Sequence, residues 1–269
     1  MSIRTTEKDS LYQNIEQMST LQILQGINQE DQKVALALKE ALPQIEKVVE
    51  KATRCLQNGG RLFYLGAGTS GRLGIVDASE LPPTFGVEPD RVIGLIAGGD
   101  SAIRTAVEFA EDKEDGAWKD LQSFKPKTQD LVLGIAASGT TPYVVGGLAL
   151  SRKNGLATAC IVCNANSPLE AQADYPIVLN TGPEFITGST RMKAGTAQKL
   201  ALNMISTAVM VKLGRVKGNK MVDMQLNNTK LVDRGTRMVM AETGLAQEQA
   251  AALLKRHGSV RAAVQSLKD

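Results

Sequence analysis

Gly-Ala-Gly-Thr-Ser-Gly-Arg, residues 66–72, is the stretch that decides the fold. The apolar run 61–65 leads into it, and a helix-capable segment, 72–80, follows it. In a strand–turn–helix unit of this kind, backbone N–H groups at the helix start face an anion, and glycines let the backbone approach it closely. Thr69 and Ser70 add hydroxyl donors. The stretch therefore predicts a turn that holds a phosphate group.

The same turn also has a plainer interpretation, because glycine-rich turns occur wherever an α/β chain reverses after a strand. The sequence here does not follow the G-x-x-x-x-G-K-[ST] pattern of a P-loop. It is also a poor dinucleotide fingerprint, since the next strand ends in Ala97-Gly98-Gly99 with no acidic residue to contact a ribose. Whether the turn binds phosphate depends on what the other turns contain.

Apolar, strand-like runs alternate with helix-capable segments through the middle of the chain. The helix-capable segments lie near 72–80, 101–122 and 142–153. Nearly continuous apolar strands are typical of a parallel sheet that is covered by helices on both faces. We therefore expect an α/β fold. Its strands are expected at 61–65, 91–97, 130–136, 157–163 and 175–179.

Helical segments flank this α/β region on both sides. A first helix is expected from Ser19 to Gly26, and a second from about 29 to 57, capped by Asn28 and broken or kinked at Pro43. Beyond Lys220 the remaining segments also read as helical, at 223–241, 246–256 and 259–267. We expect three parts: an N-terminal helical segment packed on the core (1–58), a sheet domain (59–220) and a small C-terminal helical module (221–269).

Composition narrows the class of protein. The 269 residues suffice for one large domain with a core, and a net charge of +3 is too small to indicate nucleic acid or a membrane surface as a partner. The first ten residues are polar and charged, unlike a signal peptide. Cys160 and Cys163 lie in an apolar run and are expected to be buried, and no suitably spaced ligands accompany them or Cys55 for zinc. We expect a cytoplasmic protein.

The carboxyl ends of the strands share one chemical character. The second ends in Gly98-Gly99-Asp100-Ser101 and the third in residues 137–142, Ala-Ser-Gly-Thr-Thr-Pro. Ligands of such sheets bind beyond the carboxyl ends of the strands, so these turns predict a phosphate or sugar pocket. The paired Ser/Thr turns resemble the sugar-phosphate isomerase (SIS) domain. That resemblance implies a flavodoxin-like, three-layer fold with a five-stranded parallel sheet, and phosphate contacts at Ser70, Ser138, Thr140 and Thr141, supported by the backbone of Thr69 and Gly139.

A further polar stretch follows the last strand. Residues 181–196 contain hydroxyl groups together with Arg191 and Lys193, and a long helix is expected from about 191 to 213. Hydroxyls and cations at a helix start suit an anionic ligand. The alternative is a capped helix with a solvated basic turn.

Glu80 differs from the other carboxylates of the chain. Leu81, Pro82 and Pro83 follow it, whereas Glu108, Glu111 and their neighbours form an acidic group that reads as a solvated face. Taken together, the motifs of the chain resemble the bacterial N-acetylmuramic acid 6-phosphate etherase family from about residue 19 to 228. The strings that carry the resemblance are 65–74 (LGAGTSGRLG), 77–83 (DASELPP), 94–99 (GLIAGG), 134–143 (GIAASGTTPY) and, most specifically, 188–197 (GSTRMKAGTA).

The resemblance implies a lyase that removes the D-lactyl ether at C3 of the phosphorylated sugar by elimination and water addition, in cell-wall amino-sugar (peptidoglycan) recycling. By motif match, Glu80 takes the role of acid and Glu111 that of base, with Glu108 a near rival of Glu111. Ser189, Arg191 and Lys193 would face the sugar or its lactyl carboxylate. Two carboxyl groups in opposite protonation states suffice for this chemistry, so no metal and no cofactor is expected.

The resemblance also implies a homodimer, because SIS domains commonly pair and a second subunit can complete the site near the subunit interface. Two other functions stay open on the same fold. A sugar-phosphate isomerase generally adds a histidine, and His257, the single histidine, is far from every turn in sequence. A non-catalytic sugar-phosphate-binding regulator would need no carboxylate at the position of Glu80.

Overall fold

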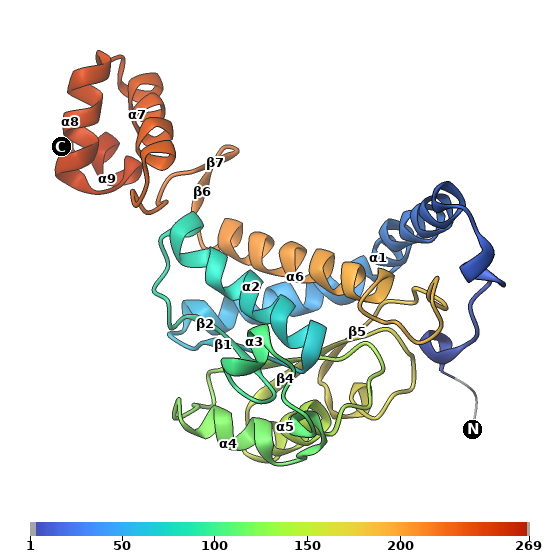
Figure 1. Ribbon diagram of the computed structural model, residues 1–269. Helices are drawn as coiled ribbons and strands as arrows, with labels where there is room; N and C mark the ends of the chain where they lie inside the picture. Colours follow the sequence, from blue (N-terminus) through green and yellow to red (C-terminus); the bar gives the residue numbers. More distant parts are fainter. Residues whose placement is uncertain (1–3, 268–269) are drawn as a thin grey trace.

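The computed structural model describes residues 4–267 and contains a five-stranded parallel sheet at its centre (Figure 1). The strand order is β2-β1-β3-β4-β5, which is the flavodoxin-like order. In register, Leu62 of β1 lies opposite Val92 on one side and Leu131 on the other. The predicted fold is confirmed. The strands are β1 (Leu62–Gly66), β2 (Val92–Ile96), β3 (Leu131–Ile135), β4 (Ala157–Val162) and β5 (Tyr175–Val178).

Helices cover both faces of the sheet, and each face has its own core. On one face lie α1 (Thr20–Gln57), α2 (Gly68–Phe85) and α6 (Lys193–Lys212), and on the other lie α4 (Gly116–Gln122) and α5 (Pro142–Lys153) (Figure 1). Tyr64 of β1 packs into the first core, while its neighbours Phe63 and Leu65 pack into the second. Because both faces are buried, the strands read as continuous apolar runs in the sequence.

The N-terminal helix differs from its prediction. The expectation of two helices, with a cap at Asn28 and a break at Pro43, is wrong, because α1 runs unbroken for 38 residues. Its start is fixed by Ser19, whose side chain accepts from the backbone N–H of Gln22 while the Gln22 side chain accepts from the Ser19 N–H. Gly26 lies within the helix, at a position where a Cβ would lie 2.5 Å from the ring of Phe185, so a side chain does not fit there.

The expected helix over 101–122 is also wrong. The segment contains a short helix, α3 (Ser101–Arg104), a 3-10 turn, η3 (Ala110–Asp112), and then α4. Phe109 between them has φ 57°, which no helix accommodates. The chain thereby folds back and buries Ala110 in the core beneath the sheet. This reversal places the acidic group of the segment beside the carboxyl edge of the sheet.

The C-terminal helices form a unit with a core of its own. A two-stranded hairpin, β6 (Val216–Lys217) and β7 (Lys220–Met221), leads to α7 (Thr229–Thr243), α8 (Gln247–His257) and α9 (Val260–Gln265). These helices stand apart from the sheet at one end of the molecule (Figure 1). Their apolar cluster includes Met238, Val239 and Leu254 and is separate from the two cores of the sheet. Among residues 4–267, no helix is long and apolar enough to cross a membrane.

Candidate active site

The first turn of the site joins β1 to α2. The N-cap of α2 is Ala67, whose methyl side chain offers no acceptor, and Gly68 begins the helix with φ 51°. The N–H groups of the first helical turn have no partner within the helix and carry its positive dipole end. Ser70 is buried, and its Oγ donates to Oε1 of Gln198 on α6 at 2.9 Å. The turn thus presents N–H groups that are unpaired within the helix at its positive end, as the predicted phosphate contact requires, and α6 packs beside it.

The turn after β3 supplies further hydroxyl groups. The Thr140 backbone N–H and its Oγ1 both lie within hydrogen-bonding distance of Ser138 Oγ, at 3.2 and 3.1 Å. Gly139 between them has φ 70°, and a Cβ there would lie 2.3 Å from Ser167 Oγ. Only glycine fits this position, since both the backbone conformation and the contact exclude a side chain. Thr141 occupies the N-cap position of α5 without a capping side-chain hydrogen bond, and the helix begins at a proline.

The N-terminal segment, residues 4–18, reaches this second turn, and the sequence analysis missed it. Arg4 Nη1 donates to Thr140 Oγ1 at 3.1 Å. Asn164, just beyond β4, donates to the carbonyl of Ala137 at 3.1 Å and accepts from the Thr6 backbone N–H at 3.2 Å. The sequence offered one signal for Asn164, because it follows a strand end like the other polar turns. Arg4 had no such signal.

The acidic segment after β2 meets the first turn at a cavity of about 420 Å³. Glu111 and Glu108 both line it, together with Gly68 and Arg72. The Arg72 guanidinium donates to the carbonyls of Ala102 and Ile103, so it holds the α3 segment against α2. The structure thus brings the turn predicted to hold phosphate and the predicted base to one cavity. It leaves the choice between the two glutamates open, since both contribute to the lining.

Glu80 lies elsewhere on the same subunit. Its side chain is exposed on α2, ten residues after Ser70, which corresponds to about 15 Å along a helix. Asp77, one turn earlier, is buried instead, and accepts from Tyr64 Oη at 3.1 Å and from Asn203 Nδ2 at 2.8 Å. Glu80 does not line the cavity that contains Glu111. Within one subunit, the two predicted catalytic carboxylates are therefore apart.

The third polar stretch precedes α6. Ser189 is half-buried and Arg191 is exposed, but Lys193 is 1% exposed and its ammonium forms an ion pair with Glu30 of α1. Glu184 accepts from the backbone N–H groups of Lys193 and Ala194, at 3.0 and 2.9 Å, and so caps α6. The Lys193 ammonium is thus engaged within the protein. Its contact with a substrate, like those of Ser189 and Arg191, stays a prediction.

The two buried carboxyl groups near the start of α6 have opposite pKa shifts. Burial raises the pKa of Glu184, and the backbone N–H groups that it accepts oppose this only in part. Burial would also raise the pKa of Glu30, but the hydrogen bonds from Lys193 and Lys33 outweigh it, and the pKa is lowered. The ion pair between Glu30 and Lys193 therefore joins α1 to α6 in the interior.

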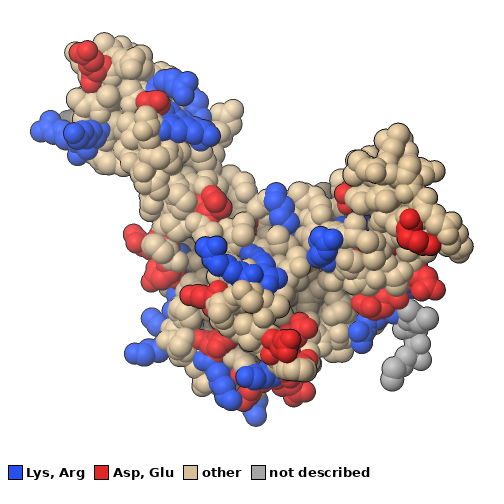
Figure 2. Space-filling view, in the orientation of Figure 1, with Lys and Arg blue, Asp and Glu red and all other residues tan. Residues whose placement is uncertain are grey.

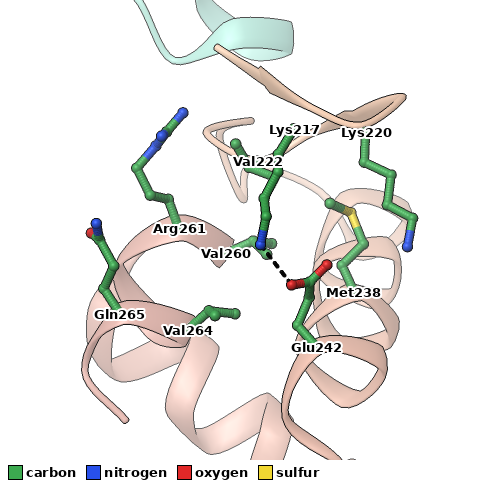
Figure 3. Close-up of a pocket in the computed structure, with 9 residues that line it drawn as sticks. All are labelled: Lys217, Lys220, Val222, Met238, Glu242, Val260, Arg261, Val264 and Gln265. Atoms are coloured by element: carbon green, nitrogen blue, oxygen red, sulfur yellow. Dashed lines mark hydrogen bonds and ion pairs between the residues drawn. The ribbon is translucent and has the colours of Figure 1, made fainter. Parts of the chain in front are cut away.

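Other groups that could carry chemistry lie away from these turns. A cavity of about 240 Å³ in the C-terminal unit is lined by Val222, Met238 and Arg261, and Lys217 forms an ion pair with Glu242 at 2.7 Å across it (Figure 3).

The cysteines are free and buried, and burial raises the pKa of Cys160 and Cys163 to about 12, so they are thiols at neutral pH. No cluster of metal-ligating side chains occurs within residues 4–267. Acidic and basic side chains are interspersed on the face shown in Figure 2.

Solved structures share the fold of this chain. A phosphoheptose isomerase from Francisella tularensis superposes with a TM-score of 0.57 at 17% identity, covering 72% of this chain and 100% of the isomerase. The phosphoheptose isomerase of Neisseria gonorrhoeae gives a TM-score of 0.55 at 16% identity, covering 71% and 98%. At this identity the likeness concerns the fold alone.

Sequence comparison is more specific. Residues 44–152 match the family model of the glucokinase regulatory protein N-terminal SIS domain. An N-acetylmuramic acid 6-phosphate etherase of Porphyromonas gingivalis is 58% identical, covering 99% of this chain and 97% of the relative. One of Christiangramia forsetii is 60% identical, covering 98% and 96%. With such identity over nearly its whole length, and with the turns and carboxylates described above, the chain belongs to the N-acetylmuramic acid 6-phosphate etherase family.

Proposed function

We propose that this protein is a carbon–oxygen lyase that cleaves the D-lactyl ether of N-acetylmuramic acid 6-phosphate. With one water consumed, the products are N-acetylglucosamine 6-phosphate and D-lactate. The observation that carries the proposal is the cavity in which the glycine-rich turn at Gly68 and the carboxylate of Glu111 meet. The etherase relatives at 58 and 60% identity support the choice of substrate. The pathway served is the recycling of cell-wall amino sugars.

The phosphate group would bind at the two hydroxyl-rich turns. The N–H groups that open α2, with Thr69 and Ser70, would hold it from one side. Ser138, Thr140 and Thr141 at the start of α5 would hold it from the other. Arg4 lies within hydrogen-bonding distance of Thr140 and would add a positive charge. Phosphate bound in this way anchors the sugar with its C2 and C3 toward the acidic segment.

The chemistry needs one base and one acid. In the ring-opened sugar, the C1 aldehyde acidifies the proton on C2, and the Glu111 carboxylate removes it. The electron pair forms a C2–C3 double bond, the C3–O bond breaks, and protonated Glu80 gives its proton to the departing lactate oxygen. Glu80 then removes a proton from water as its oxygen adds to C3, and Glu111 returns a proton to C2. Each glutamate ends in its starting state, as a general acid–base pair requires.

The separation of Glu80 from Glu111 supports a homodimer with its active sites near the subunit interface. Exposed apolar side chains occur on the same layer of helices as Glu80, with Val76 of α2 58% exposed and Met204 of α6 40% exposed. A wide groove lined by Leu42 and Pro43 of α1 runs beside α6 on the same layer. A second copy packed on this layer would cover these side chains and bring its Glu80 toward a cavity that already holds Glu111.

The test is a reaction of purified protein with N-acetylmuramic acid 6-phosphate in deuterated water. We expect D-lactate to be released and deuterium to appear at C2 of the product. In Glu111→Gln, the rates of C2 exchange and of lactate release should both fall at least about 100-fold, because general acid–base catalysis contributes roughly 10²–10⁴-fold. Glu80→Gln should lose lactate release but keep C2 exchange, since it acts on the leaving group. Glu108→Gln is the matched control and should stay near wild-type activity.

Other outcomes would redirect the proposal. Loss of activity in Glu108→Gln but not in Glu111→Gln would move the base to Glu108, which lines the same cavity. Tight sugar-phosphate binding without lactate release would indicate a regulator. Isomerisation of a sugar phosphate without lactate release would indicate an isomerase.

We also propose a cytoplasmic location and the division into parts at residues 58 and 220. Three free, buried cysteines suit a reducing compartment, and the separate core of the C-terminal helices supports a boundary near residue 220. Cell fractionation tests the first proposal. Expression of residues 1–220, followed by a thermal unfolding experiment, tests the second: a cooperative transition is expected, and aggregation would contradict the boundary.

A further inference from the structure

Gln198 lies on α6 directly beside the phosphate turn, with its side chain in the interior at 1% exposure. Ser70 Oγ donates to its Oε1 at 2.9 Å. One helical turn earlier on α6, a Cβ at Gly195 would lie 3.4 Å from Thr69 Cγ2. The start of α6 is therefore packed on the two hydroxyl residues that we place against the phosphate.

One polar atom of the Gln198 amide, the nitrogen Nε2, has no hydrogen-bond partner among the residues that the structure describes. Within the described part of the chain, no acceptor lies within hydrogen-bonding distance of its Nε2. A buried N–H group without a partner is destabilising, and such groups are rare. If the amide is turned over, Nε2 comes to the position from which Oε1 now accepts, and it can donate to Ser70 Oγ. In the arrangement of the structure, Nε2 is the unpaired atom.

Bound phosphate changes which arrangement is favoured. A serine hydroxyl has a single proton, and in this structure Ser70 gives it to Gln198. A phosphate dianion accepts hydrogen bonds only, so it competes with Oε1 for that proton. We propose that Gln198 is a positioning residue that reverses its amide when phosphate binds. Nε2 then donates to Ser70 Oγ, and the Ser70 proton turns to a phosphate oxygen.

The reversal accounts for both states. Without phosphate, the Ser70 O–H has the Gln198 carbonyl as its acceptor, and the reversal would remove that acceptor. With phosphate, the O–H forms a charge-assisted hydrogen bond to a phosphate oxygen, and Nε2 gains Ser70 Oγ as its acceptor. The inference rests on the proposed function, because it takes the phosphate to lie at Ser70.

The test compares three side chains at position 198 by calorimetric titration with inorganic phosphate, and by kinetics with the phosphorylated sugar. Gln198→Glu keeps the shape, but its carboxylate only accepts, so it holds the Ser70 proton. We expect Kd and KM to rise about tenfold or more, with kcat nearly unchanged. Gln198→Met has no acceptor to compete for that proton, and we expect Kd within about threefold of wild type. If Gln198 acted through packing alone, Gln198→Glu would not weaken phosphate binding more than Gln198→Met does.

Two further measurements separate the mechanism from simple charge repulsion. In a Ser70→Ala background, the increase in phosphate Kd caused by Gln198→Glu should fall to a small fraction of its size in wild type. If the introduced carboxylate acted by repelling the phosphate, the increase in Kd would keep its full size, and the inference would be overturned. In protein labelled with ¹⁵N-glutamine, the side-chain amide resonance of Gln198 is identified as the one that is absent from the spectrum of Gln198→Met. This resonance should shift when phosphate is added to the wild-type protein. An unshifted resonance at saturating phosphate would equally overturn it.

Failure of the inference and failure of the proposed function are distinguishable. Phosphate binding with the expected order of variants, but no lactate from the sugar, would overturn the etherase activity and leave the role of Gln198 intact. Lactate release with the same KM in all three proteins would overturn the role of Gln198 and leave the activity intact.

Discussion

Two carboxylates three residues apart on α2 have opposite environments. Asp77 is 5% exposed and accepts hydrogen bonds from Asn203, Ser206 and Tyr64, whereas Glu80 is exposed. A spacing of three residues turns the side chain by about 60° around a helix, which is enough to move it from the core to the surface. Burial raises the pKa of Asp77, and the three hydrogen bonds oppose that rise only in part. The buried carboxylate is thus structural, and the exposed one is available for chemistry.

This environment predicts the pH dependence of Asp77→Asn. Because the pKa of Asp77 is raised in the folded state, its contribution to stability is fully present below the unfolded pKa and is lost as pH rises through the folded pKa. The variant cannot titrate, and its amide can still pair with Asn203, Ser206 and Tyr64. As the pH rises from acid to neutral, the wild type loses stability at Asp77 and the variant does not. The free energy of unfolding of the variant, minus that of wild type, should therefore increase with pH.

Urea unfolding of both proteins at several pH values from 4 to 8 measures this difference. Asp90→Asn, which removes an exposed aspartate, is the control for the loss of one carboxyl group. A difference for Asp77→Asn that is flat, or that falls with pH, would contradict the raised pKa.

At the scale of elements, the N-terminal segment and the loop before α6 hold each other in place. Ser10 donates to the carbonyl of Phe185 at 2.6 Å, and Thr6, which is 0% exposed, pairs with Asn164 beyond β4. Tyr12 packs on the ring of Phe185 with centroids 4.7 Å apart. The segment is thus fixed at the β3 and β4 turns and at the loop that leads to α6. Its order depends on these side chains because it contributes no strand to the sheet.

Asn164→Ala should therefore release this segment. Asn164 pairs with both Thr6 and the Ala137 carbonyl, so the substitution leaves buried groups unpaired and should cost roughly 1–3 kcal/mol of unfolding free energy. Cleavage by trypsin after Lys8 should become faster under native conditions. Asn154→Ala, at the exposed end of α5, is the control and should leave the cleavage rate unchanged. An equal rate in both variants would show that Asn164 does not anchor the segment.

The elements that the sequence predicted are those decided by local pattern. The five strands were found because each is an apolar run, which is buried throughout in β1 and β3, and the helix expected at about 191–213 is present as α6. The failures depend on distant contacts. Gly26 was expected to end a helix but is the residue on which the ring of Phe185 packs, and Phe109 reverses the chain so that Ala110 reaches the core. The burial of Lys193 against Glu30 could not be read from a basic turn, since the partner is 163 residues away.

At the scale of the whole molecule, the candidate site is incomplete in one chain. The turns, the acidic segment and Glu111 converge on the carboxyl edge of the sheet, while Glu80 projects from the outer layer of helices. The same layer exposes apolar side chains, including Leu42 and Met204, at 47 and 40%. The proposed homodimer accounts for both features, because a second copy would cover the layer and supply its own Glu80. Two inactive variants test which subunit provides each carboxylate.

Mixing Glu80→Gln with Glu111→Gln, after subunit exchange in mild denaturant, should restore lactate release. If each site combines Glu80 of one subunit with Glu111 of the other, a mixed dimer has one site with both carboxylates and one with neither. Random exchange then gives about a quarter of wild-type activity, as expected for a two-fold dimer. Each variant carried through the same treatment alone should stay inactive. If both carboxylates of a site came from one subunit, no mixed dimer would contain an intact site, and the mixture would stay inactive while its dimers formed normally on a sizing column.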